Sequence, residues 1–92
     1  MSTVSNVERQ IRRTEGFDVH VLHPDGRDVR GDRDHLPTYP FTKKAAGTAT
    51  VADWRRSRFT MRYPGFEVEV VDARGNPVHG GTQLRTVRAS YR

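Results

Sequence analysis

The hydrophobic and polar positions of this chain follow one pattern twice. Residues 16–31, GFDVHVLHPDGRDVRG, return without a gap 49 positions later as residues 65–80, GFEVEVVDARGNPVHG. Seven of the sixteen aligned pairs are identical, where average composition would give roughly one. The identical residues are apolar strand positions and glycines. The repeat therefore predicts a structural unit that occurs twice, and it carries no information about chemistry.

Each copy opens with an alternation of apolar and polar residues that is typical of a half-buried β-strand. The apolar positions expected to face the core are Phe17, Val19, Val21, Phe66, Val68 and Val70. A Pro-Asp-Gly turn follows at residues 24–26, and Gly75 holds the matching position in the second copy. Both copies are thus predicted to be β-hairpins. Pro77 falls in the second return strand, which places that strand at a sheet edge or a bulge.

A helix is predicted before each hairpin. Ser5 and Glu8 have capping-box spacing, and apolar residues at positions 4, 7 and 11 form a helical stripe. Thr50 and Asp53 repeat the start signal, and the pattern continues to residue 57 or 58. The predicted unit is therefore helix, strand, strand, present at residues 4–31 and again at residues 50–80.

Two segments lie outside the repeated units. Residues 82–92 have Leu84, Val87 and Tyr91 at helical spacing, while their β-branched content also allows a strand; we favour a helix. Residues 32–49 form a long connection, which indicates a functional loop, a mobile linker or an unrecognised element such as a helical turn at 41–46. The prediction is a single α+β domain over residues 1–92, in which the two duplicated hairpins form one antiparallel sheet packed by helices.

Composition excludes several classes of function. The 92 residues include no cysteine, so a disulfide framework and a thiolate nucleophile are excluded. No stretch is long and apolar enough to span a bilayer, and the first residues do not resemble a signal peptide. His20 and His23 would point to opposite faces of a strand and cannot share a metal ion. We expect a cytoplasmic protein that is not an enzyme and has no cofactor, no metal and no membrane partner.

The charge is positive and unevenly placed. The formal net charge is +5, and residues 48–92 hold eight basic but only four acidic side chains. Fourteen of the sixteen basic residues are arginine, a side chain suited to phosphate. A GC-rich genome would produce the same excess through codon usage, so both explanations stay open.

One cluster has a composition suited to nucleic acid. Residues 54–63 contain four arginines and three aromatic residues, and single-stranded nucleic acid binds to such combinations of cations and stacking surfaces. In the competing interpretation Trp54 and Phe59 anchor the helix in the core, with Arg56 the most exposed of its first three arginines. The candidate nucleic-acid-binding residues are Lys43, Lys44, Arg55, Arg56, Arg58 and Arg62. Three separated segments would have to converge for these residues and the tail arginines Arg85, Arg88 and Arg92 to share one surface.

Two classes of function follow. The first is a small basic accessory protein that binds DNA or RNA, of the kind that mobile elements and phages carry. The second is a protein-binding module without ligand chemistry, such as a homodimer formed through an unpaired strand edge. Acidic side chains on the polar faces of the strands disfavour RNA binding on the sheet itself.

Overall fold

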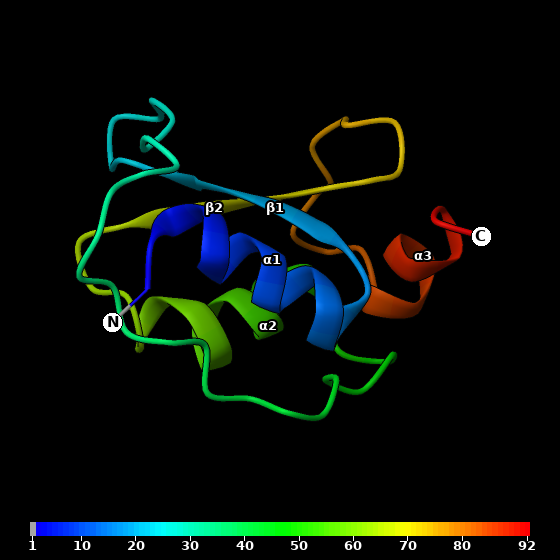
Figure 1. Ribbon diagram of the computed structural model, residues 1–92. Helices are drawn as coiled ribbons and strands as arrows, with labels where there is room; N and C mark the ends of the chain where they lie inside the picture. Colours follow the sequence, from blue (N-terminus) through cyan, green and yellow to red (C-terminus); the bar gives the residue numbers. More distant parts are fainter. Residues whose placement is uncertain (1) are drawn as a thin grey trace.

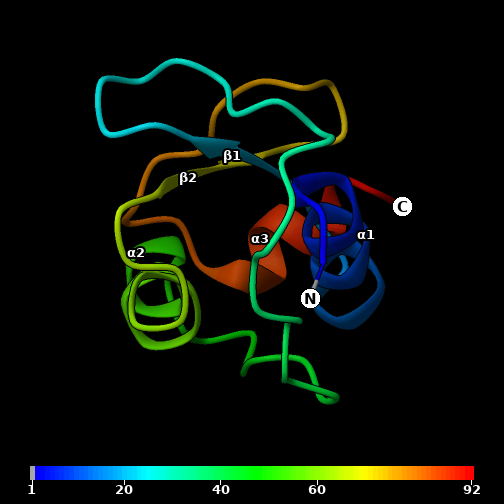
Figure 2. The same cartoon turned by 60° about the vertical axis from the view of Figure 1, so that its left-hand side comes forward.

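A two-stranded antiparallel sheet with helices packed on one of its faces makes up the fold (Figure 1). The computed structural model describes residues 2–92. In chain order the elements are α1 (Val4–Glu15), β1 (Asp18–Leu22), α2 (Val51–Trp54), the π-helix η1 (Arg55–Thr60), β2 (Glu67–Val71) and α3 (Leu84–Ala89). Figure 2 shows the sheet as one layer, the helices as a second, and the loop around residues 40–49 beyond the helices. The α+β class predicted from the sequence is confirmed.

The N-cap of the first helix lies two residues before the predicted one. It is Thr3, whose side chain accepts a hydrogen bond from the amide of Asn6, so the assignment of the cap to Ser5 was wrong. Val7 and Ile11 are buried as expected. Gly16 ends the helix with φ of 85°, a conformation that glycine adopts without strain. At twelve residues this is the longest helix, and none within residues 2–92 is long and apolar enough to cross a membrane.

The second helix begins with the predicted capping box between Thr50 and Asp53. It then widens into η1 and continues to Thr60, beyond the predicted end at residue 57 or 58. A π-helix bonds residue i to residue i+5. This widening places Trp54 and Phe59 on the same side, and both are buried with ring centroids 6.3 Å apart.

The sheet has the predicted inward face. Val19 pairs with Val70 and Val21 with Val68, and all four are buried. Phe66 is only partly buried. The return segments are not strands, contrary to the prediction, because each makes a single bridge, Leu22 with Asp28 and Val71 with Pro77. Pro77 has no N–H for a ladder, and its segment lies at the sheet edge.

The two turns have the same hydrogen bonds. The amide of His23 donates to the carbonyl of Arg27 at 2.8 Å, and the amide of Asp72 donates to that of Asn76 at 2.9 Å. The matching glycines at positions 26 and 75 have φ of 92° and 83°. The residues paired at the centre of the ladder, at positions 20 and 69, are themselves one repeat length of 49 apart. Exchanging the two strands therefore leaves the register unchanged.

The remaining segments differ in how well they were predicted. The helix favoured for residues 82–92 is confirmed as the shorter α3, which begins after Gln83. The helical turn suggested for residues 41–46 is wrong, because that stretch has no helix. The connection instead packs in an extended form, with Leu36 bridged to Ser2 and Tyr39 buried.

We expect Val19→Asp or Val68→Asp to unfold the protein. The two side chains are only 4% and 5% exposed, and a buried carboxylate without a partner costs several kcal/mol against a total stability of about 5–15 kcal/mol. Thermal unfolding followed by circular dichroism measures the effect. The control is His20→Asp on the exposed face of the same strand, which should melt like wild type. Wild-type melting of Val19→Asp would contradict the orientation of the strand.

Candidate polyanion-binding surface

A buried carboxylate at the end of α1 joins four segments of the chain. Glu15 is 0% exposed. Its carboxylate accepts hydrogen bonds from the Tyr39 hydroxyl at 2.6 Å, the Ala45 amide at 2.9 Å and Arg58 Nη1 at 2.8 Å. Arg88 Nη2 lies 3.3 Å from the other side of the carboxylate, and Arg88 Nε donates to the backbone carbonyl of Glu15. A fully buried charge is tolerated because donors surround it.

The partners of Glu15 are themselves held in place. The Tyr39 hydroxyl accepts from Trp54 Nε1 at 3.1 Å. Burial, with a further contribution from the Glu15 carboxylate, raises the pKa of Tyr39 above its ordinary value. Arg58 also donates to the carbonyl of Lys43 and lies over the ring of Phe41, with its guanidinium carbon 4.3 Å from the ring centroid. The network therefore fixes the loop after residue 40 against the helices.

The three segments on which a basic surface was expected meet at this network. Arg58 comes from η1, Lys43 from the loop and Arg88 from α3. The side chains of Arg58 and Arg88 are only 21% and 11% exposed, so their guanidinium groups are engaged mainly with Glu15. The central role of Glu15 was not predicted from the sequence. The available signal was its position four residues after Ile11, in line with the apolar stripe of α1.

Several cations on the segments that meet at the network remain exposed. Lys43 and Lys44 are exposed on the loop, and Arg13 is exposed two residues before Glu15. Arg85 is exposed on α3, where its amide donates to the carbonyl of Gly47 at 3.0 Å. Residues 36–52 and 73–92 contain no Asp or Glu. The loop and the tail therefore contribute cations and no carboxylates.

The other candidate residues do not join this surface. Arg56 is 74% exposed and pairs with Asp53 at 2.9 Å, whereas Arg55 and Arg58 are partly buried, so the prediction that Arg56 is the most exposed of the three is confirmed. Arg55 lines a groove at the edge of β2, and Arg62 lines a cavity with residues 33–37. The core positions predicted for the rings at 54 and 59 are confirmed, and the ring at 63 is buried as well. None of these rings is available to stack on bases.

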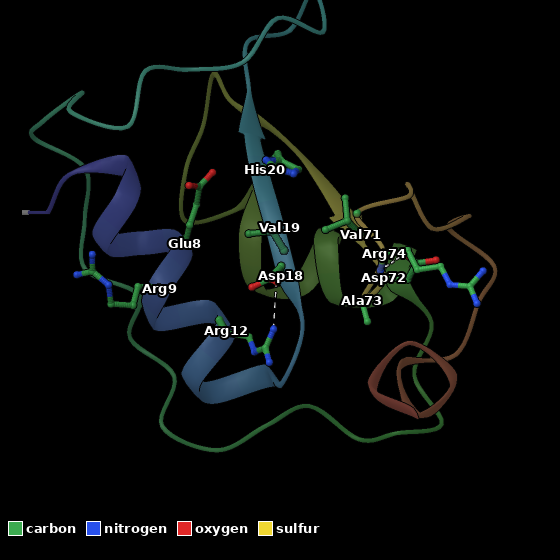
Figure 3. Close-up of a pocket in the computed structure, with 11 residues that line it drawn as sticks. Glu8, Arg9, Arg12, Asp18, Val19, His20, Val71, Asp72, Ala73 and Arg74 are labelled. Carbon is green, nitrogen blue, oxygen red and sulfur yellow. Dashed lines mark hydrogen bonds and ion pairs between the residues drawn. The ribbon is translucent and has the colours of Figure 1, made fainter. Parts of the chain in front are cut away.

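A groove of about 580 Å³ lies between α1, β1 and the turn at residues 72–75 (Figure 3). Its charged groups alternate in sign, and Arg12 pairs with Asp18 across 3.1 Å. Glu8 reaches from α1 to β1, where it accepts a hydrogen bond from the Val21 amide at 2.9 Å. Burial raises the pKa of Glu8, and the bond from Val21 opposes that shift. Mixed charge makes this groove a poor site for a polyanion.

Comparison with protein families, with curated proteins and with solved structures found no match to this chain. Within residues 2–92 no three His, Cys, Asp or Glu side chains gather closely enough to hold a metal ion. The function must therefore be argued from the geometry and the charges.

Glu15→Ala is expected to destabilise the protein by about 3–5 kcal/mol, because it leaves Arg58 and Arg88 partly buried without their counter-charge. Urea unfolding measures the change. Asp25→Ala is the matched control: it breaks a surface pair with Arg27, whose side chain is 80% exposed, and should cost less than about 1 kcal/mol. Equal losses in the two variants would show that Glu15 is not the centre of the network.

Glu8→Gln should change how stability depends on pH. The folded-state pKa of Glu8 lies above its ordinary value of 4.5, so between these two values the folded protein binds more protons than the unfolded chain. Wild-type stability therefore loses a component as the pH rises through this window, and the glutamine variant lacks that loss. The melting temperature of Glu8→Gln minus that of wild type should increase from pH 4 to pH 7. A difference that is constant over this range would contradict the assignment.

Proposed function

We propose that this protein binds nucleic acid through the phosphate backbone, using a surface made of Arg13, Lys43, Lys44 and Arg85, called here the basic loop surface. The observation that supports it is the convergence at Glu15. One buried carboxylate holds the end of α1, the loop after residue 40 and α3 together. The exposed cations of the loop and of α3 are thereby brought to segments whose sequence has no carboxylates, and Arg13 adds a cation at the end of α1.

The chemistry of such a surface is electrostatic. Lysine and arginine contacts to phosphate release counterions from the nucleic acid and give an affinity that falls steeply with salt. The buried rings at positions 54, 59 and 63 are not available to bases, so binding is expected without sequence preference and to DNA or RNA alike. Asp18 and Glu67 are exposed on the strands, which directs a polyanion away from the sheet.

The arginines of the second helix have different parts in this proposal. Arg58 holds the loop in position through Glu15 and the Lys43 carbonyl instead of contacting phosphate. Arg56 and Arg62 are exposed and add long-range attraction. Arg55 lies in a groove with acidic side chains and contributes least.

We also propose that the two halves descend from one duplicated helix-and-hairpin unit. The matching turns support this, and so do the helix starts: the Val4 amide donates to the Arg33 carbonyl, and the Val51 amide donates to the Thr82 carbonyl, both at 2.9 Å. The loop after residue 40, which carries the lysines, lies between the two units and is hydrogen-bonded to the second through Arg58, so we expect nucleic acid to bind on the side of the scaffold where this loop lies. A cytoplasmic location and an accessory role in a mobile element or phage complete the proposal and rest on sequence alone.

The test is charge reversal on the loop. Lys43→Glu with Lys44→Glu should weaken binding to a duplex of generic sequence by about tenfold or more at low salt. Fluorescence anisotropy of a labelled duplex measures the affinity. The wild-type log–log salt slope should be about −3.6 for four phosphate contacts, and the double variant should show about −1.8. The control, Arg27→Glu with Arg30→Glu, makes the same change in charge on the first hairpin, at side chains 80% and 86% exposed.

A third double variant separates the loop from the helix. Arg56→Glu with Arg62→Glu should weaken binding less than the loop variant and leave the slope almost unchanged. If it weakens binding more, the helix is the contact surface. If wild type is not retained on nucleic acid at low ionic strength, the proposal fails. The protein-binding alternative, which includes a homodimer, then takes its place and is tested by sedimentation of the wild-type protein.

A further inference from the structure

A second groove, of about 340 Å³, lies at the edge of β2. It corresponds in position to the groove of Figure 3. The first groove, called here the β1 groove, contains residues 18–20 and the turn at 72–75; the second, called the β2 groove, contains residues 67–69 and the first turn around residue 24. The strand and the turn of one groove lie 49 residues from their counterparts in the other. Glu8 and Arg55 occupy equivalent helix positions, because each comes five residues after its helix cap, Thr3 or Thr50.

Beside the β1 groove, one residue beyond its lining residues 18–20, the outer edge of the strand is hydrogen-bonded at Val21. The carbonyl of Val21 accepts from the Val29 amide at 3.0 Å, and the amide of Val21 donates to the Glu8 carboxylate at 2.9 Å. The Glu8 carboxylate thus satisfies the amide of Val21, a residue whose backbone faces away from β2.

In the β2 groove the same position lacks an acceptor. Val70 corresponds to Val21, and its carbonyl accepts from the Val78 amide at 2.9 Å. No hydrogen bond within residues 2–92 uses the Val70 amide, which faces away from β1. The residue that replaces Glu8 is Arg55, which has donors only, and its Nε is buried without a partner. Two donors therefore line one groove, and no side chain in the described part of the chain accepts a hydrogen bond from the Val70 amide or from Arg55 Nε.

We propose that the β2 groove binds a side-chain carboxylate of a partner polypeptide, which accepts hydrogen bonds from the Val70 amide and the Arg55 guanidinium. Buried donors left without partners are costly, and a carboxylate can accept from both in charge-assisted bonds. Glu8 shows that the scaffold accommodates this group at the equivalent place.

The groove favours a carboxylate over a polyanion. Glu67 and Glu69 also line it, yet neither forms an ion pair with Arg55 within 4.0 Å. Their charges oppose a phosphate chain more strongly than a single carboxylate. The outward backbone of Val68 lies on the same edge, so an extended segment that carries the one carboxylate can pair there as an added strand. This site is separate from the basic loop surface.

The first experiment measures amide hydrogen exchange by NMR. In wild type the Val70 amide should exchange about tenfold faster than the Val21 amide, relative to their unfolded rates. Arg55→Glu supplies the missing carboxylate and should slow Val70 exchange to about the level of Val21. Arg55→Gln, which also offers an acceptor oxygen, gives a second route to the same result if the glutamate variant does not fold. Equal protection of the two amides in wild type, or no change at Val70 in either variant, overturns the proposal.

The second experiment adds ligand to wild-type protein. A blocked tripeptide with a central glutamate should shift the Val70 amide and the Arg55 Nε–Hε resonances in a saturable way, and the peptide with a central glutamine should not. Arg55→Gln should abolish the shift, whereas Lys43→Glu with Lys44→Glu should retain it. No shift with the glutamate peptide overturns the proposal. An equal response to inorganic phosphate also overturns it, because the groove would then be a general anion site.

Discussion

Burial of Glu15 is the constraint on which the arrangement of the loop and tail depends. A carboxylate with no exposed surface must be paired with cations and fully hydrogen-bonded. The rest of α1 supplies no partner for it. The chain supplies Tyr39 and Ala45 from the loop, Arg58 from η1 and Arg88 from α3. One charge therefore ties together segments that no strand or long helix connects, and backbone bonds such as that from the Arg85 amide to the Gly47 carbonyl add to it. The positions of the loop lysines follow from it.

The excess of arginine has more than one physical role. Arg58 and Arg88 neutralise an interior charge, and Arg58 also covers the ring of Phe41. Other arginines pair on the surface, such as Arg12 with Asp18, where the gain in stability is small. The net charge of a sequence therefore overstates the number of cations available to a ligand, and so does a local cluster of arginines. Both include interior guanidinium groups as well as exposed ones.

The sequence predicted what local rules determine. Alternation identified the buried valines of both strands, and the Thr50 capping box identified a helix start. The predicted return strands are not present, because each return segment makes only one bridge, and in the second segment Pro77 has no N–H for a ladder. The widening into η1 depends on burying Trp54 and Phe59 together, which is a tertiary effect. Half of the candidate site could not be predicted from local sequence patterns either. The contact of Arg58 with Glu15 and the bond from the Arg85 amide to the loop depend on the tertiary fold.

The near-symmetry of the two halves makes their differences informative. The two strands and their turns match in register and in backbone hydrogen bonds, and a groove lies at the outer edge of each strand. A polar group that is satisfied beside one groove and not beside the other therefore points to a difference in what the two grooves bind. Glu8 satisfies the Val21 amide, whereas Arg55 adds a donor beside Val70. Packing alone would favour an acceptor at both places, because an unpaired buried donor costs free energy. Retaining a donor at the second place is consistent with an acceptor that comes from outside the chain.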